Sequence, residues 1–117
     1  DAGAEYIITQ MFFDNKDFFE FEKKCRAMGI TVPIIPGIKP LALKNQIRVL
    51  PELFYINMPE DLKKSINACK DDNEACLVGT EWCIMQAREL IQHKVPTIHL
   101  FTYGAVKQMQ NVCEKIF

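Results

Sequence analysis

Apolar and polar residues alternate in blocks along the chain, and the blocks predict strands and helices in turn. Three short segments rich in Ile, Val, Phe and Thr are typical of strands buried in a parallel sheet, at residues 5–13, 32–35 and 97–102. Apolar residues repeated every three or four positions predict helices between Asp14 and Gly29 and at residues 41–50, 60–68, 74–93 and 105–116. The expected order is therefore β-α-β-α-α-α-β-α.

Capping and turn residues mark several of these boundaries. Asp14 is a suitable helix N-cap, and Gly29 can end the same helix because glycine accepts the left-handed conformation. Pro36 and Gly37 predict a turn after the second strand. The first helix is expected to bury Phe18, Phe21, Cys25 and Met28. The fourth is expected to bury Leu77, Val78, Trp82, Met85 and Leu90. The last is expected to bury Val106, Met109, Val112, Cys113 and Ile116.

Strands that alternate with helices indicate an α/β fold, with parallel strands and helices packed outside the sheet. Three such strands alone would leave two sheet edges with unpaired backbone groups. We therefore expect residues 1–117 to form a single partial domain whose missing strands lie upstream, with somewhat under half of the roughly 250 residues typical of an eight-stranded barrel. The N-terminus, which has no Met, also fits a chain that begins inside a larger protein.

Composition narrows the class of protein and its partners. A chain with 49% hydrophobic and 25% charged residues can bury a core, which excludes a disordered tail. The net charge of -1 is spread without long blocks of one sign, so we expect no nucleic-acid or membrane partner. No apolar run approaches the roughly 20 residues that span a bilayer, and no signal peptide is visible, so we expect a cytoplasmic protein.

The five cysteines predict neither a disulfide framework nor a metal site. Their number is odd and no Cys-x-x-Cys pair occurs, which favours reduced thiols. Cys69, Cys76 and Cys83 are spaced by seven residues, but the polar segment 70–73 breaks any helix that would run through all three. Glycine-rich phosphate loops and His-Glu-x-x-His are also missing from the sequence.

Two polar residues inside the apolar strands are candidates for chemistry. Gln10 needs a partner, because a buried amide without one costs about 1–3 kcal/mol. It either bonds to a neighbour in the core or points into the mouth of a barrel toward a ligand, and the sequence leaves both open. His99 shares a strand face with Phe101 and has no clear triad partner, which favours a hydrogen-bonded core histidine over a catalyst.

Three segments, in order, carry a resemblance to a known family. They are Ile8-Thr9-Gln10-Met11-Phe12-Phe13-Asp14 after Asp1-Ala2-Gly3-Ala4, then Val32-Pro33-Ile34-Ile35-Pro36-Gly37-Ile38-Lys39-Pro40, and Ile98-His99-Leu100-Phe101-Thr102. Together they resemble the methylenetetrahydrofolate reductases, in the order of the last three strands of that family's barrel. The chain also ends just after the last expected helix, which resembles bacterial-type members without a C-terminal regulatory region.

The resemblance implies that residues 1–117 are the C-terminal portion of a (β/α)8 TIM barrel. It also implies a flavoprotein of one-carbon metabolism and methionine supply. In this family FAD takes hydride from NADH or NADPH, which leaves before 5,10-methylenetetrahydrofolate is reduced to 5-methyltetrahydrofolate. By position, Gln10 matches a glutamine that contacts the folate pterin, and Gln46 matches a second substrate-contacting glutamine. Leu50 stands where some members place an aromatic near the ligand, and Phe101 where they often have Tyr. The choice of nicotinamide and the oligomeric state stay open, and a homo-oligomer is compatible with the sequence.

The sequence departs from the family pattern after the last strand. The family commonly continues into Thr-Leu-Asn-Arg, whose Arg helps bind substrate, whereas this chain has Thr102-Tyr103-Gly104-Ala105. Lys107 is a candidate substitute for that cation, and equally a surface lysine. The resemblance also implies that the family's catalytic glutamate and most FAD contacts lie upstream, so we expect no catalytic residue here and little flavin binding by the chain alone.

A protein of a different class is also compatible with the sequence. A free-standing α/β interaction module could pair through its exposed sheet edges with a partner or with a second copy. Gln10 discriminates between the two hypotheses, because its replacement by Leu would be neutral or stabilising in such a module but would impair folate turnover in a reductase.

Overall fold

The computed structural model describes residues 3–102 and 106–116. Three parallel strands form one sheet in the order β1-β2-β3, with bounds β1 (Ile7–Met11), β2 (Ile34–Ile38) and β3 (His99–Leu100). The helices of the described part are α1 (Asn15–Ala27), α2 (Gln46–Phe54), α3 (Glu60–Asn67), α4 (Asp72–Gln92) and α5 (Val106–Ile116). The predicted α/β class and order of elements are confirmed. Within these residues no helix combines the length and apolar character needed to cross a membrane.

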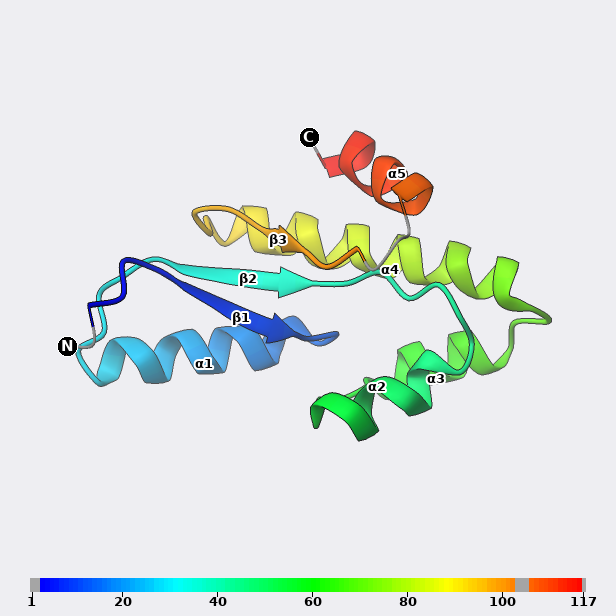
Figure 1. Cartoon of the computed structure of the whole chain (residues 1–117), viewed down its shortest axis with the longest axis horizontal. Coiled ribbons are helices and arrows are strands. Elements are labelled where there is room, and N and C mark those ends of the chain that lie inside the picture. Colours follow the sequence, from blue (N-terminus) through cyan, green and yellow to red (C-terminus); the bar gives the residue numbers. More distant parts are fainter. Residues whose placement is uncertain (1–2, 103–105, 117) are drawn as a thin grey trace.

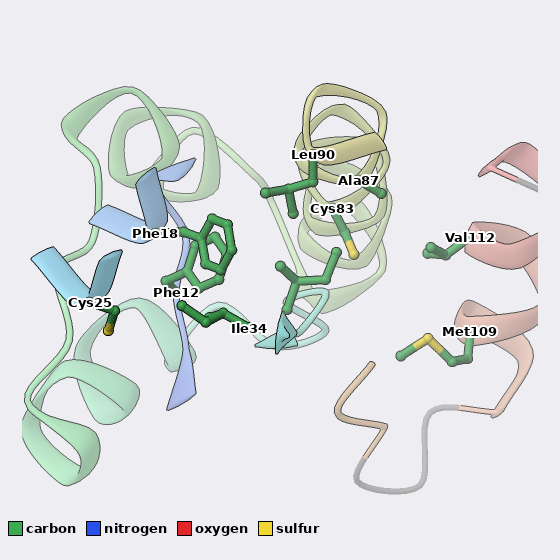
Figure 2. Packing of buried hydrophobic residues seen from close by; sticks show 10 residues of the cluster. Phe12, Phe18, Cys25, Ile34, Cys83, Ala87, Leu90, Met109 and Val112 are labelled. Carbon is green, nitrogen blue, oxygen red and sulfur yellow. The ribbon is translucent and has the colours of Figure 1, made fainter. Parts of the chain in front are cut away.

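One face of the sheet packs against α1, α4 and α5. Ile34 and Ile38 of β2 are fully buried in a cluster to which these three helices contribute. Figure 2 shows Leu90 and Cys83 directed from α4 toward the strands, with residues of α5 approaching from the far side of α4. Outer helices therefore cover this face of the sheet, as predicted.

The opposite face of the sheet is open among the described residues. Ile8 pairs with Ile35, and Gly37 pairs with His99, so these residues lie on the same face. Ile8 is 43% exposed, and Ile35 and His99 are only partly buried. The sheet is thus covered by helices on one side only.

A second apolar cluster lies where the strands end. Figure 1 shows α2 and α3 beyond the ends toward which β1 and β2 point. The buried members of this cluster come from the ends of β1 and from the segments that follow β2: Met11, Phe13, Leu41, Leu50, Met58, Leu62, Ile66, Cys69 and Ala75. Helices α2 and α3 therefore shield the segments that leave the strands.

Capping residues set the ends of two helices. The Asp14 side chain accepts a hydrogen bond from the Lys16 N–H at 3.0 Å, and Gly29 follows α1 with a φ of 85°. Both predictions for α1 are confirmed. Asp71 likewise accepts from the Glu74 N–H at 3.0 Å, so α4 begins at Asp72 rather than at residue 74.

The turn predicted at Pro36 and Gly37 is wrong, because both residues lie inside β2. Pro36 lies before the first residue pair between β2 and β3, and on its other side the pairing with β1 is irregular. The N–H that proline lacks would therefore have no regular partner in the sheet, so its absence costs little. Gly37 is required by packing: a Cβ there would lie 2.6 Å from the Phe101 ring and 2.7 Å from the Thr9 carbonyl oxygen. Glycine is needed at position 37 because the Phe101 ring and the Thr9 carbonyl lie close to its backbone, and not because the chain turns there.

Three other boundaries differ from the predicted ones. β3 is restricted to His99–Leu100, and β1 to Ile7–Met11, with Ile8 and Gln10 exposed rather than buried on both faces. α2 begins at Gln46 and runs through Pro51 to Phe54, instead of spanning residues 41–50. The residues before Gln46 form a loop, in which the N–H groups of Ala42 and Leu43 donate to Gln46 Oε1 and that of Lys44 donates to Asp72 of α4.

The buried faces of the helices were predicted in part. Phe18, Cys25, Leu90, Met109 and Val112 are buried as expected, whereas Phe21, Met28, Leu77, Met85 and Val106 are exposed. α4 instead buries mostly small side chains and one amide: Ala75, Gly79, Cys83, Gln86, Ala87 and Leu90. Small and amide residues give no apolar periodicity, so the pattern identified only part of the buried face of this helix: Leu90 is buried, and Val78 and Trp82 pack against the second cluster.

Gly79 lets the loop after β2 approach the α4 backbone. A Cβ on Gly79 would overlap the carbonyl oxygen of Leu41 and lie 2.7 Å from its carbonyl carbon. Leu41 is only 1% exposed, so the loop cannot move aside without opening the second cluster. This contact fixes the start of the segment that leads to α2.

We expect Gly79→Ala to lower the free energy of unfolding by about 1–3 kcal/mol, the usual cost of overpacking. Alanine gains roughly 1 kcal/mol over glycine in a helix interior, so only a steric clash can make this change destabilising. Urea unfolding followed by circular dichroism measures the effect, with Glu81→Ala on the exposed face of α4 as control. A Gly79→Ala protein as stable as the wild type would contradict the close contact.

Candidate functional site

The C-terminal ends of the three strands gather the residues predicted to bind substrate. Gln10 stands at the end of β1, Phe101 directly follows β3, and Gln46 and Leu50 belong to α2, which follows β2. In parallel α/β sheets, ligands bind at this end because side chains from several strands and the following loops meet there. The described residues therefore place the candidate site at this edge of the sheet.

Gln10 is exposed, which corrects the expectation that it is an amide inside a buried strand. Its Oε1 accepts a hydrogen bond from the Met11 N–H at 3.0 Å. The pairing of β1 with β2 shifts register between Ile8 and Met11, so Gln10 sits at an irregularity of the strand. Such irregularities re-aim side chains, and here the amide nitrogen of Gln10 is the end that can donate to a ligand.

An open apolar hollow of about 340 Å³ borders Gln10 along the free edge of β1. It lies between β1 and α1, and Asp17 is its one carboxylate. Its complete lining is Ile7, Ile8, Thr9, Gln10, Phe12, Asp17, Phe18 and Phe21. Gln46, Leu50 and Phe101 do not line this hollow.

Gln46 and Leu50 lie one helical turn apart on α2 and have different environments. The Gln46 Oε1 accepts hydrogen bonds from the Ala42 N–H at 2.7 Å and the Leu43 N–H at 3.0 Å. Its carbonyl thus holds the loop before α2, and its Nε2 group is the end suited to donate to a ligand. Leu50 is 6% exposed and belongs to the second apolar cluster.

Phe101 packs against the second cluster and lies over Gly37. The His99 ring contacts it edge-on, with ring centroids 4.6 Å apart, as their shared strand face predicts. His99 is half-buried, and its ring has no hydrogen-bond partner among the described residues. The ring contact, not the expected hydrogen bond, holds this histidine.

The structure brings together some of the predicted site residues but not all of them. Leu50 belongs to the second cluster, which also includes Met11, the neighbour of Gln10, and Phe101 packs against this cluster. Gln10 itself borders the hollow at the free edge of β1. Position 105, where the family arginine is expected, lies outside the described residues, and Lys107 is exposed on α5.

A buried lysine that sequence reasoning passed over lies just after β2. Lys39 is 4% exposed, and its Nζ donates to the Pro40 carbonyl at 3.2 Å. Burial lowers the pKa of its ammonium group, while the nearby Cys83 thiol acts in the opposite direction. Burial likewise raises the pKa of the Cys83 thiol to about 12, with a smaller rise from Cys113 and an opposing effect of Lys39.

The five cysteines are free thiols with different exposure. Cys69 follows α3, whereas Cys76 and Cys83 lie within α4, so the predicted break between the first two is confirmed. No group of three His, Cys, Asp or Glu residues within residues 3–102 and 106–116 is placed to hold a metal ion.

Two further glutamines, on the outer helices α4 and α5, hold the segments next to Gln10 and Gln46. Gln86 of α4 donates to the Phe12 carbonyl at 3.1 Å, and Gln108 of α5 donates to the Leu41 carbonyl at 2.7 Å. Both glutamines are buried, at 1% and 6% exposure. Sequence reasoning missed them because a glutamine on an amphipathic helix normally faces solvent.

Comparison with known proteins gives the same family as the sequence motifs. Residues 1–116 match the family described as methylenetetrahydrofolate reductase. This chain belongs to the methylenetetrahydrofolate reductase family. It is 35% identical over 99% of its length to a probable methylenetetrahydrofolate reductase (NADPH) of Caenorhabditis elegans, and 29% identical over 99% to the 5,10-methylenetetrahydrofolate reductase of Escherichia coli. A methylenetetrahydrofolate reductase (NADH) of Arabidopsis thaliana is 31% identical over 92% of the chain.

The chain is much shorter than these reductases. It spans 18% of the length of the worm and plant proteins and 40% of that of the E. coli enzyme. The names of the worm and plant proteins specify NADPH and NADH respectively, so the family includes users of either nicotinamide.

We expect Cys83 to be alkylated by iodoacetamide at pH 8 at least about 100-fold more slowly than the half-buried Cys76 and Cys113. The thiolate is the reactive form, and a pKa raised to about 12 leaves almost none of it at this pH. Peptide mass spectrometry over a time course measures the rates, and labelling in concentrated urea is the control. Equal rates in the native protein would show that the region around Cys83 is open.

Proposed function

We propose that this chain forms the last three strand–helix units of an eight-stranded barrel and supplies part of its folate-binding site. The whole protein would reduce 5,10-methylenetetrahydrofolate to 5-methyltetrahydrofolate with NADH or NADPH through FAD, in the cytoplasm. The observation that carries this proposal is the family match over residues 1–116, within which Gln10, Gln46 and Phe101 stand at the ends of parallel strands or in the segments that follow them.

The open side of the sheet supports the barrel arrangement. Helices cover the face of the sheet that carries Ile34 and Ile38. On the opposite face, Ile8 is exposed, and Ile35 and His99 are only partly buried. β1 is an edge strand, and the exposed residues Tyr6 and Ile8 lie along it. In a closed barrel an additional strand would pair with this edge, and the open face would become the packed interior.

Within this proposal the residues of this chain bind and orient the folate. The Gln10 and Gln46 side chains can donate their amide N–H groups to acceptor atoms of a pterin ring. Phe101 offers an aromatic surface beside the ring, held in place by Gly37 and His99. Fixing the ring in this way lowers the entropic cost of hydride transfer to the folate carbon.

We expect the described residues to bind little flavin by themselves. Gly37 and Gly79, the glycines of β2 and α4, are packed against protein atoms and leave no room for a phosphate there. A bound flavin supplies the hydride relay between the nicotinamide and the folate, and we place its binding residues in the part of the protein outside this chain. The contribution of this chain is to hold the folate.

We expect Gln10→Leu in the full-length protein to lower kcat/KM for methylenetetrahydrofolate about tenfold, the size of one lost hydrogen bond. The midpoint of thermal unfolding should change little, because Leu is close to Gln in size and the hydrogen bond that is lost joins Gln10 only to the N–H of its neighbour Met11. Steady-state kinetics and calorimetry measure the two quantities. Gln92→Leu, at the exposed end of α4, is the matched control and should change neither.

The visible absorption spectrum of the full-length protein tests the proposal as a whole. A flavin band that bleaches with NADH or NADPH and returns with methylenetetrahydrofolate supports the reductase. A colourless full-length protein that does not turn over the folate would overturn it and favour an interaction module that pairs through the β1 edge.

A further inference from the structure

The turn after β1 is held by one stripe of α4. The Gln86 Nε2 donates to the Phe12 carbonyl and to the Asn15 Oδ1, both at 3.1 Å. Asn15 donates in return to the Gln86 carbonyl at 3.1 Å and to the Glu89 Oε1 at 2.8 Å. One turn earlier in α4, the Trp82 Nε1 donates to the Phe13 carbonyl at 2.7 Å. The carbonyl groups of two consecutive residues, Phe12 and Phe13, are thus both held by side chains of α4, a helix far away in the sequence.

The strand ladder does not fix Gln10 in the same way. Pairing of β1 with β2 is irregular between Ile8 and Met11, so regular backbone bonds are interrupted on either side of Gln10. Side chains replace them: Thr9 Oγ1 accepts from the Gly37 N–H at 2.9 Å, and Gln10 Oε1 accepts from the Met11 N–H at 3.0 Å. The anchor that follows Gln10 along the chain is therefore the contact of the Phe12 and Phe13 carbonyls with α4.

A second buried glutamine holds the other turn in the same manner. The Gln108 Nε2 donates to the Leu41 carbonyl at 2.7 Å and to the Thr80 Oγ1 at 3.0 Å. The next two residues, Ala42 and Leu43, donate their N–H groups to the Oε1 of Gln46. The position of Gln46 thus follows from where Gln108 holds the loop.

Both anchoring glutamines keep an unsatisfied group. Their Oε1 atoms are buried without a hydrogen-bond partner among the described residues. Such groups are costly, so a core selected only for stability would place an apolar side chain at these positions. We explain the presence of glutamine at these positions by its N–H groups, which donate to specific backbone carbonyls: Gln86 to Phe12 and Gln108 to Leu41.

We propose that Gln86 and Gln108 are positioning residues, which act on the folate through Gln10 and Gln46 respectively. This inference rests on the proposed function for its kinetic consequences. Each glutamine fixes one turn, so the two effects should be separable: Gln86 governs the turn after β1, and Gln108 governs the loop before α2.

Crossed double-mutant cycles in the full-length protein test this pairing. Gln86→Met and Gln108→Met remove the amide donors with little change in side-chain length, and each is combined with Gln10→Ala and with Gln46→Ala. Alone, each Met variant should raise KM for methylenetetrahydrofolate about fivefold, with little change in the rate of flavin reduction by nicotinamide. Trp82→Phe, which removes the bond to the Phe13 carbonyl but keeps an aromatic ring against the second cluster, is an alternative variant should Gln86→Met fail to fold.

The expected result is coupling within pairs and additivity between them. Gln86→Met should have less than about a twofold effect on KM once Gln10 is Ala, and should keep its full effect when Gln46 is Ala. Gln108→Met should show the reverse. Effects that add in every combination, or single variants without any effect on KM, would overturn the proposal.

Hydrogen exchange of the same variants separates this inference from the proposed function. Gln86→Met should accelerate exchange in residues 10–15 about tenfold and leave residues 41–46 unchanged, and Gln108→Met should do the opposite. If the wild-type protein does not turn over methylenetetrahydrofolate, the proposed function fails, and this exchange pattern still decides whether each glutamine holds its own turn. Equal acceleration of both segments by either variant would indicate general destabilisation and contradict the inference.

Discussion

The contact between α4 and the carbonyl group of Leu41 constrains the rest of this structure. It requires a glycine at position 79, where any side chain would overlap the Leu41 backbone. The same helix carries Trp82 and Gln86, which hold the turn after β1. Helix α4 thus contacts the segments that follow both β1 and β2, and Gln108 of α5 also holds the second of them. The proposed folate site lies at this edge of the sheet, so the outer helix would be part of its support.

The sequence predicted the order of elements because their signals are local. Asp14 and Gly29 bound α1 through the N-cap bond and the left-handed backbone, which depend on neighbouring residues alone. Pro36 and Gly37 gave the opposite result, because a glycine chosen for contact with Phe101 and Thr9 has the same appearance in sequence as a glycine chosen for a turn. The start of α2 was missed for a related reason, since contacts with the distant helices α4 and α5 hold the loop before it in addition to the local bonds to Gln46.

The candidate site was predictable only as far as its motifs extend. Gln10 was found as a polar residue in an apolar strand, and Gln46 and Phe101 through the family resemblance; all three lie at the ends of strands or in the segments that follow. Nothing in the periodicity of α4 distinguishes the buried Gln86 from the exposed Gln92, because the difference lies in what packs against each face. Lys39 was overlooked for the same reason, since a lysine after a strand normally reaches solvent.

The long sequence separation of the anchoring bonds has a consequence for how the chain folds. The bonds that hold the two turns join residues 71, 69 and 67 positions apart in the chain. Closing loops of this length is costly before the contacts form, so structures that depend on them are acquired slowly. Strands and helices with local signals can form early, whereas the turns that carry Gln10 and Gln46 take their final shape only when α4 and α5 dock. The segments proposed to bind the folate are therefore among the last parts of this chain to become ordered.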